Sequence, residues 1–151
     1  MIDYVQIPGY QLEYRNRENR RGGGVAVYIS DKIKGYKVRK DIHRVIPDIE
    51  QLWLEVEGKN KNHSFLIGTV YQPNSDIASK EEWLQSLETR LSYINSKWDG
   101  PIIICGDTNI NLSSTSAITQ QYTELLNVFS LSNVVSKTNE TREYGNRSFN
   151  Y

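Results

Sequence analysis

A carboxylate and an amide stand two residues apart directly after a short apolar run. Residues 101–105 predict a short buried strand, and Gly106-Asp107-Thr108-Asn109 follows it. A carboxylate there can coordinate Mg²⁺ or take a proton from water, and an amide beside it can orient that water or donate to a phosphoryl oxygen. Gly106 would let a substrate or a neighbouring backbone approach closely. Asp107 and Asn109 are therefore candidate catalytic residues.

A second polar segment follows another apolar run, and it offers a phenol. Residues 71–74 read Tyr-Gln-Pro-Asn, after Val70. The phenol of Tyr71 can contact a phosphate or a leaving oxygen. A structural alternative stays open for the first cluster, because aspartate and asparagine routinely make Asx turns. In that interpretation Asp107 and Asn109 only shape a turn.

The net charge of zero hides an uneven distribution along the chain. The 151 residues contain 18 Lys and Arg and 18 Asp and Glu. Residues 1–40 carry nine basic and four acidic side chains, whereas residues 41–151 carry nine and fourteen. A polyanion partner would favour the basic part through phosphate contacts and counterion release, and a solvated loop is the structural alternative. The basic excess is densest just before Gly22-Gly23-Gly24, at Arg15, Arg17, Arg20 and Arg21.

Composition excludes several classes of protein. The single cysteine, Cys105, rules out an internal disulfide, and with two histidines it leaves too few soft ligands for a structural zinc site. We expect Cys105 to be a small buried hydrophobe and His43 and His63 to be solvated loop residues without a catalytic role. No apolar run approaches the roughly 18 residues of a membrane span, and the N-terminus lacks the pattern of a signal peptide. The sequence therefore predicts an intracellular domain with no membrane partner.

Apolar patterning predicts a mixture of strands and helices. Strands are expected at 25–29, 36–39, 51–57, 65–71 and 101–105, with the third and fourth forming an antiparallel hairpin. The alternation in 51–57 predicts a half-buried strand with Trp53 on its polar side. These elements indicate a two-layer or multilayer α/β fold rather than a parallel doubly wound sheet.

Two helices are expected in the second half. Ser79 and Glu82 form a capping-box pattern, and a helical stripe follows at Leu84, Leu87, Leu91 and Ile94. Residues 113–116 can cap the second helix. Its apolar stripe is Ile118, Tyr122, Leu125, Leu126 and Phe129.

Four segments in a fixed order carry a family resemblance. They are Arg-Gly-Gly-Gly-Val-Ala-Val-Tyr at 21–28, Leu-Trp-Leu-Glu-Val at 52–56, Val-Tyr-Gln-Pro-Asn at 70–74 and Ile-Ile-Cys-Gly-Asp-Thr-Asn at 103–109. Together they resemble the endonuclease/exonuclease/phosphatase superfamily, and most of all the apurinic-type endonuclease domain of non-LTR (LINE-like) retrotransposon reverse transcriptases. The resemblance covers nearly the whole chain. It implies that residues 1–151 are a single domain, part of a four-layer α/β/β/α sandwich with mostly antiparallel sheets.

The resemblance also implies hydrolysis of phosphodiester or phosphomonoester bonds with Mg²⁺ or Mn²⁺. By position, Asp107 matches the carboxylate that activates or positions water, and Asn109 matches the residue that orients this water and the phosphate. Both also match the metal site. Tyr71 and Asn74 match residues that contact the phosphate. Thr108 replaces a bulky apolar residue, which affects local packing more than chemistry.

The partner that the resemblance implies is the phosphate backbone of DNA. Arg20, Arg21 and Arg142 are the expected substrate-binding cations, and a retrotransposon origin implies a nuclear location. The family's first asparagine and its metal-binding glutamate would precede Met1, and its last aspartate and Asp-His pair would follow Tyr151. We therefore expect a chain that lacks the main glutamate ligand and is itself weak or inactive.

Three functions remain open from the sequence. The first is a metal-dependent endonuclease that nicks DNA in the intact protein. The second is a small-molecule phosphatase of the same superfamily, which the Arg-Gly-Gly-Gly-Val opening disfavours. The third is a non-catalytic relic that binds nucleic acid or a protein. The sequence does not indicate an oligomeric state.

Overall fold

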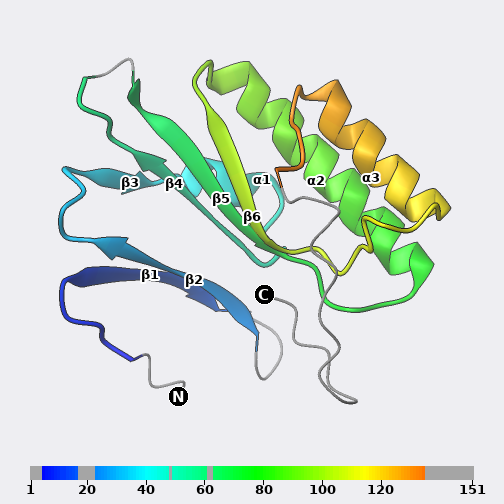
Figure 1. The fold of residues 1–151 in the computed structure, drawn as a ribbon, viewed down its shortest axis with the longest axis horizontal. Coiled ribbons are helices and arrows are strands. Elements are labelled where there is room, and N and C mark those ends of the chain that lie inside the picture. The colour runs from blue at the N-terminus through cyan, green and yellow to red at the C-terminus, as the bar shows by residue number, and fades with distance from the viewer. Residues whose placement is uncertain (1–4, 17–22, 48, 61–62, 135–151) are drawn as a thin grey trace. The chain divides into compact units, whose positions relative to one another are not determined.

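A computed structural model describes residues 5–16, 23–47, 49–60 and 63–134. The chain divides into two compact units, Met1–Asn109 and Ile110–Tyr151. The first unit contains β1 (Tyr10–Asn16), β2 (Gly24–Ser30), β3 (Tyr36–Val38), α1 (Lys40–Val45), β4 (Gln51–Val56), β5 (Phe65–Tyr71), α2 (Ile77–Lys97) and β6 (Ile102–Asp107) (Figure 1). The second unit contains α3 (Ala117–Val128).

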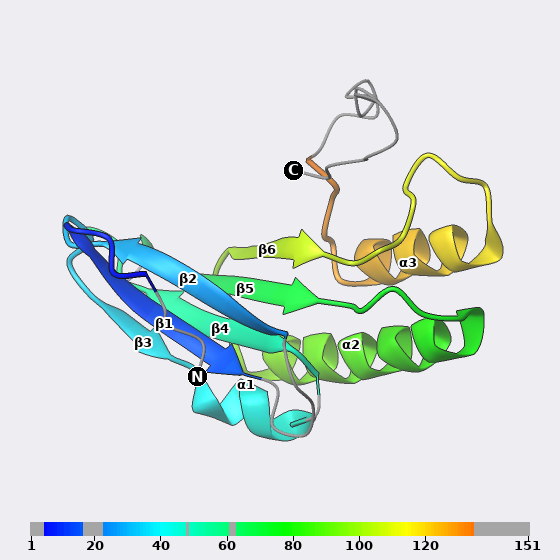
Figure 2. The ribbon, with the colours of Figure 1, turned by 90° about the horizontal axis from the view of Figure 1, so that it is seen from below.

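The strands of the first unit form two sheets within the described residues. β1 and β2 pair antiparallel as a two-stranded sheet, and the other sheet has the order β3-β4-β5-β6. Pairing is antiparallel from β3 to β5 and parallel between β5 and β6. The predicted strands and the β4–β5 hairpin are therefore confirmed, as is a mixed α/β fold with mostly antiparallel strands. The two-stranded sheet lies on one face of the larger sheet, and α1 and α2 lie on the other (Figure 2).

The larger sheet is buried on both faces along β4. On one face, Leu52, Leu54 and Val56 pack with Val25 and Ile29 of β2. On the other, Trp53 is 0% exposed and lies directly over Gly68 of β5. The prediction of a half-buried strand with Trp53 on a polar side is therefore wrong. The reason is that α1 and α2 cover the face that the Glu55 and Glu57 pattern assigned to solvent.

Helix α2 begins earlier than its capping pattern predicts. Asp76 is the N-cap residue, and its Oδ1 accepts the backbone N–H of Ser79 at 2.8 Å. Ser79 is thus the third residue of the helix and not its cap. Aspartate caps as well as serine does, so the earlier start satisfies the same backbone donors. The predicted stripe at Leu84, Leu87, Leu91 and Ile94 is confirmed, since all four side chains are buried.

Helix α3 matches its predicted apolar stripe. Leu125 is buried, and the other four residues of the stripe are half-buried. Thr119 is buried as well and donates its hydroxyl to the backbone oxygen of Asn111 at 3.0 Å, which ties the helix to the loop before it. Within the described residues, no helix is long and apolar enough to cross a membrane.

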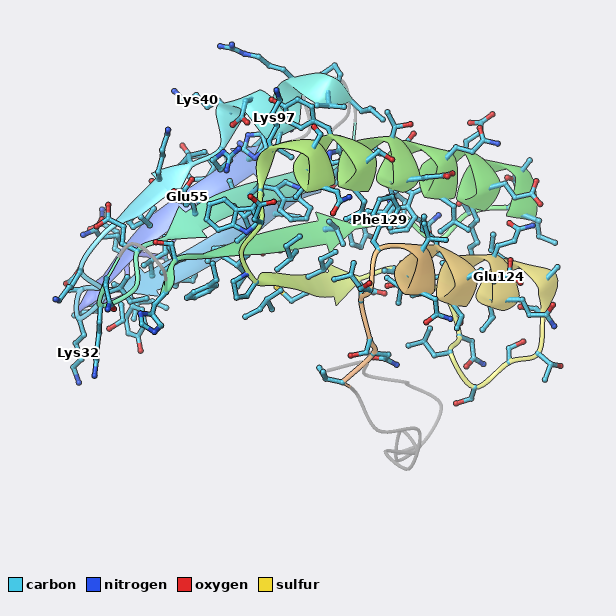
Figure 3. All side chains as sticks on the ribbon, turned by 90° about the horizontal axis from the view of Figure 1, so that it is seen from above. Lys32, Lys40, Glu55, Lys97, Glu124 and Phe129 are labelled. Atoms are coloured by element: carbon cyan, nitrogen blue, oxygen red, sulfur yellow. The ribbon has the colours of Figure 1, made fainter. Side chains whose placement is uncertain are left out.

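Helix α1 is tied to β4 by polar contacts. Arg39 forms ion pairs with Asp41 at 2.8 Å and with Glu55 at 3.2 Å, and Glu55 lies on β4 (Figure 3). The Arg39 guanidinium holds the pKa of the Asp41 carboxyl well below its usual range. His43 is half-buried, and its Nε2 accepts the backbone N–H of Trp53 at 2.9 Å. The prediction that His43 is a solvated loop residue is therefore wrong.

Burial and the nearby Arg15 and Arg90 lower the pKa of His43 from 6.5 to about 4. The folded chain thus favours the neutral ring. The contribution of His43 to the free energy of unfolding is fully present above the unfolded pKa of about 6.5, and it is lost as the pH drops to about 4. Glutamine keeps an acceptor but does not titrate. We therefore expect His43→Gln to lose less stability than the wild type over this pH range. Urea unfolding of both proteins across that range measures the effect. Identical pH profiles would contradict it.

The contact between Trp53 and Gly68 gives a second prediction. A Cβ on Gly68 would lie 2.5 Å from Cη2 of the Trp53 ring, so Gly68→Ala should cost about 2 kcal/mol by overpacking. Trp53→Phe removes the ring atoms that would clash, but it also removes packing contacts of the larger ring and so destabilises the chain by itself. We expect the double variant to be at least about 1 kcal/mol more stable than the sum of the single effects predicts, as measured by urea unfolding. Additive effects would show that the two residues do not compete for the same space.

Candidate functional site

The two polar segments meet at one edge of the larger sheet. β5 and β6 run parallel and end together, with Tyr71 opposite Asp107 in the register. The backbone N–H of Gln72 donates to the backbone oxygen of Asp107 at 2.8 Å, which extends the pairing past the strand ends. Paired residues point to the same face of a sheet, so the phenol and the carboxylate leave this edge on the same side. The fold therefore brings together Tyr71 and Asp107, which stand far apart in the sequence.

Gly106 makes this close pairing possible. Its φ is +132°, and a Cβ at this position would lie only 1.8 Å from the backbone oxygen of Val70. A side chain there would collide with backbone that cannot move aside without breaking the β5–β6 ladder. The close approach expected at Gly106 is therefore made by a neighbouring strand.

Asp107 and Asn109 form the turn that the structural alternative describes. The backbone N–H of Asn109 donates to Asp107 Oδ1 at 2.8 Å, and Asn109 has a φ of +47°, which asparagine tolerates better than most residues. Asn109 Nδ2 also donates to the backbone oxygen of Gln72 at 2.6 Å, so its amide fixes the end of β5. Asp107 remains exposed. The turn and a chemical role for its carboxylate are thus compatible, because the turn occupies one oxygen and leaves the group open to solvent.

Tyr71 and Asn74 differ in their exposure. Tyr71 is half-buried and packs on the core formed by β2 and β4, while Asn74 is exposed on the loop that leaves β5. Arg20, Arg21 and Arg142 lie outside the described residues.

Three residues near this edge were not predicted from the sequence. Gln72 is 2% exposed and donates Nε2 to Ser75 Oγ at 3.0 Å. Lys80 Nζ donates to the backbone oxygen of Asn109 at 2.9 Å, so α2 supports the same turn. Glu50 is buried, and its backbone oxygen accepts the N–H of Tyr71 at 3.0 Å. Gln72 stands inside the polar segment 71–74, which was the available signal; Lys80 and Glu50 have no local pattern that marks them.

Cys105 is exposed, which overturns the prediction of a buried side chain. Among the described residues β6 is the edge strand of its sheet, and the two-stranded sheet packs against β4 and β5 instead. Ile103, on the same face of β6, is accordingly 49% exposed. The apolar run 101–105 is thus an edge strand with one open face.

The donor set at this edge suits a metal ion that keeps much of its water. Asp107 offers one exposed carboxylate, and Asn109 offers an amide oxygen. In the part of the chain that the structure describes, no three His, Cys, Asp or Glu side chains gather as a metal site. Mg²⁺ is commonly held by one or two carboxylates together with substrate phosphates and waters. Asp107 and Asn109 fit that mode and do not form an all-protein cage.

The Asn109 contacts predict a stability effect. Asn109→Ala removes the donor to Gln72 and places a less tolerant residue at a positive φ, so we expect a loss of about 1–2 kcal/mol. Asn95→Ala, on an exposed position of α2, is the control and should change stability by less than about 0.5 kcal/mol. Chemical denaturation measures both. A loss at Asn109 no larger than at Asn95 would show that the amide does not fix the turn.

Comparisons with protein-family models and with curated protein sequences find no match. The likeness to the endonuclease/exonuclease/phosphatase superfamily therefore stays a hypothesis that rests on the residues themselves.

Proposed function

We propose that this chain is part of a metal-dependent phosphodiesterase of the endonuclease/exonuclease/phosphatase type that nicks DNA in the intact protein. The observation that carries the proposal is the pairing of Tyr71 with Asp107 at the shared end of β5 and β6. These residues come from two separate motifs, and the resemblance assigns both to one site. Their meeting supports the proposed superfamily and its four-layer sandwich.

Each residue has a role that its position allows. Asp107 has an exposed carboxylate, and its free oxygen can accept a proton from the attacking water. Asn109 keeps an amide oxygen and one N–H after donating to Gln72, and these can orient the water and the phosphate. Tyr71 leaves the sheet on the same side as Asp107, so its hydroxyl can contact the phosphate.

Mg²⁺ or Mn²⁺ is the proposed cofactor, held by Asp107 and Asn109 together with the substrate phosphate. When bound, such an ion neutralises the charge that develops on the phosphoryl oxygens. The glutamate that the resemblance expects would add the main protein ligand.

The basic excess of the N-terminal part supports DNA as the partner. Lys32 follows β2 in the sequence and lies at the end of the unit away from the ends of β5 and β6 (Figure 3). Arg17, Arg20 and Arg21 stand between β1 and β2 in the sequence, outside the described residues. Their charge would raise the affinity of the chain for phosphates.

The decisive substitution is Asp107→Ala, tested by nicking of supercoiled plasmid with Mg²⁺. Because the resemblance expects further site residues outside residues 1–151, the assay uses both this chain and a longer version extended by flanking coding sequence. We expect nicking by the longer version and a loss of at least about 100-fold in Asp107→Ala. Asp99→Ala, an exposed aspartate on the loop after α2, is the matched control and should nick normally.

The other outcomes select among the alternatives. Nicking that survives Asp107→Ala would contradict the assignment of this site. Salt-dependent DNA binding without nicking by the longer version would favour the non-catalytic relic. Hydrolysis of small phosphate esters in preference to DNA would favour the phosphatase.

A further inference from the structure

Two guanidinium groups from different layers of the first unit meet at the segment between α1 and β4. From β1, Arg15 Nη2 donates to the backbone oxygen of Pro47 at 2.6 Å. From α2, Arg90 Nη2 donates to the backbone oxygen of Ile46 at 2.7 Å. Ile46 and Pro47 are consecutive residues, whose Cα atoms lie about 3.8 Å apart. The two side chains therefore converge on one short stretch of backbone, and we call this place the arginine junction.

The other donors of these two groups have no acceptor. Arg90 is 0% exposed, and its Nε and Nη1 are buried without a hydrogen-bond partner. Nη1 of Arg15 is buried and unpartnered as well. Among the described residues, neither arginine forms an ion pair with a carboxylate. A buried charge with unsatisfied donors is strongly unfavourable, so a stable fold requires an acceptor at this place.

Acceptors in the same segment already have donors of their own. The backbone oxygen of Ile46 accepts from Gln51 Nε2 at 3.4 Å in addition to Arg90, and a carbonyl oxygen has only two lone pairs. Glu50, a buried carboxylate in this segment, accepts the backbone N–H of Gly24 at 2.6 Å. The remaining guanidinium donors therefore need an acceptor other than these groups.

The two arginines act electrostatically on each other and on a third basic side chain. Burial, and after it the charge of Arg15, lowers the pKa of Arg90 from 12.5 to about 9, so the group stays protonated at neutral pH. Besides burial, the charges of both arginines lower the pKa of His43, and Asp41 on α1 acts in the opposite direction. Positive charge is thus concentrated at the arginine junction.

We propose that the arginine junction binds a small inorganic anion of the size of chloride, which accepts the unpartnered donors of Arg90 and Arg15. An anion forms charge-assisted hydrogen bonds with guanidinium groups, and these are stronger than neutral ones. A monatomic ion suits the place better than a phosphate, because Arg90 is fully enclosed and two backbone oxygens border the donors. The ion joins β1 to α2 and so connects the two-stranded sheet to the helical layer. This role is separate from the proposed cleavage of DNA.

The first measurement follows the stability of the full chain against chloride concentration, by urea unfolding at neutral pH. Sodium gluconate replaces sodium chloride at constant ionic strength, so that screening stays the same. An ion that binds only the folded chain raises the folding equilibrium constant in proportion to its concentration, once this exceeds the dissociation constant. We expect each tenfold rise in chloride in that range to raise the folding constant about tenfold. A folding constant that does not depend on chloride would overturn the proposal.

Arg90→Met tests whether the effect belongs to this place. A buried charged residue can often be replaced by an apolar one of similar volume without loss of stability, so this variant should fold. It should lose the dependence on chloride. Arg44→Met is the matched control, because Arg44 is an exposed arginine on α1, and it should keep the dependence. A dependence on chloride that survives in Arg90→Met would contradict the assignment of the ion to the arginine junction.

The second measurement uses the wild-type chain and reports on the ion through a neighbour. A bound anion offsets the charges of Arg15 and Arg90, so chloride should raise the pKa of His43 and lower its acid dissociation constant about tenfold. NMR titration of the histidine rings in sodium chloride and in sodium gluconate measures this change. His63, an exposed histidine between β4 and β5, is the internal control and should titrate alike in both salts. The same pKa of His43 in both salts would overturn the proposal.

Discussion

The close approach of two backbones, at Val70 and Gly106, is the constraint on which the candidate site depends. Parallel pairing of β5 with β6 continues to Tyr71 and Asp107 only because position 106 has no side chain. The Cβ of any other residue would be enough to push β6 away from β5. The glycine before Asp107 thus acts on strand pairing, and through strand pairing on the distance between the phenol and the carboxylate.

The rest of the first unit keeps these two strands in place. β4 is buried on both faces, by β2 on one side and by the helices on the other, so it is a rigid partner for β5. The ring of Trp53 occupies the space that Gly68 leaves open on β5. Lys80 and Asn109 then fix the loops that leave the strand ends. Because each contact supports the same edge, the position of the site residues follows from core packing and not from the polar residues alone.

Local patterns in the sequence predicted most elements, because the apolar periodicity and turn residues lie within each element. The stripe on α2 and the β4–β5 hairpin are examples, and both are confirmed. The wrong predictions concern side chains whose exposure depends on elements that are remote in the sequence. Trp53 is buried because helices cover its face, and Cys105 is exposed because β6 has no strand beyond it in the described sheet. An alternation pattern describes one strand and contains no information on which layers cover it.

The same limit explains why the site was predicted in part. Asp107, Asn109 and Tyr71 carry motifs, whereas Glu50 is marked only by its contacts. No periodicity distinguishes a buried glutamate before a strand from a solvated one.

Glu50 also joins the two sheets of the first unit to each other, through Gly24 of β2 and Tyr71 of β5. A two-stranded sheet is marginal alone, so β1 and β2 depend on their packing against β4 and on the contacts of Arg15 and Gly24 with the segment before β4. Those contacts lie at the end of β1 and the start of β2, and the backbone oxygen of Glu50 also accepts the N–H of Tyr71. The contacts that attach the small sheet to the larger one therefore reach the edge where Tyr71 pairs with Asp107.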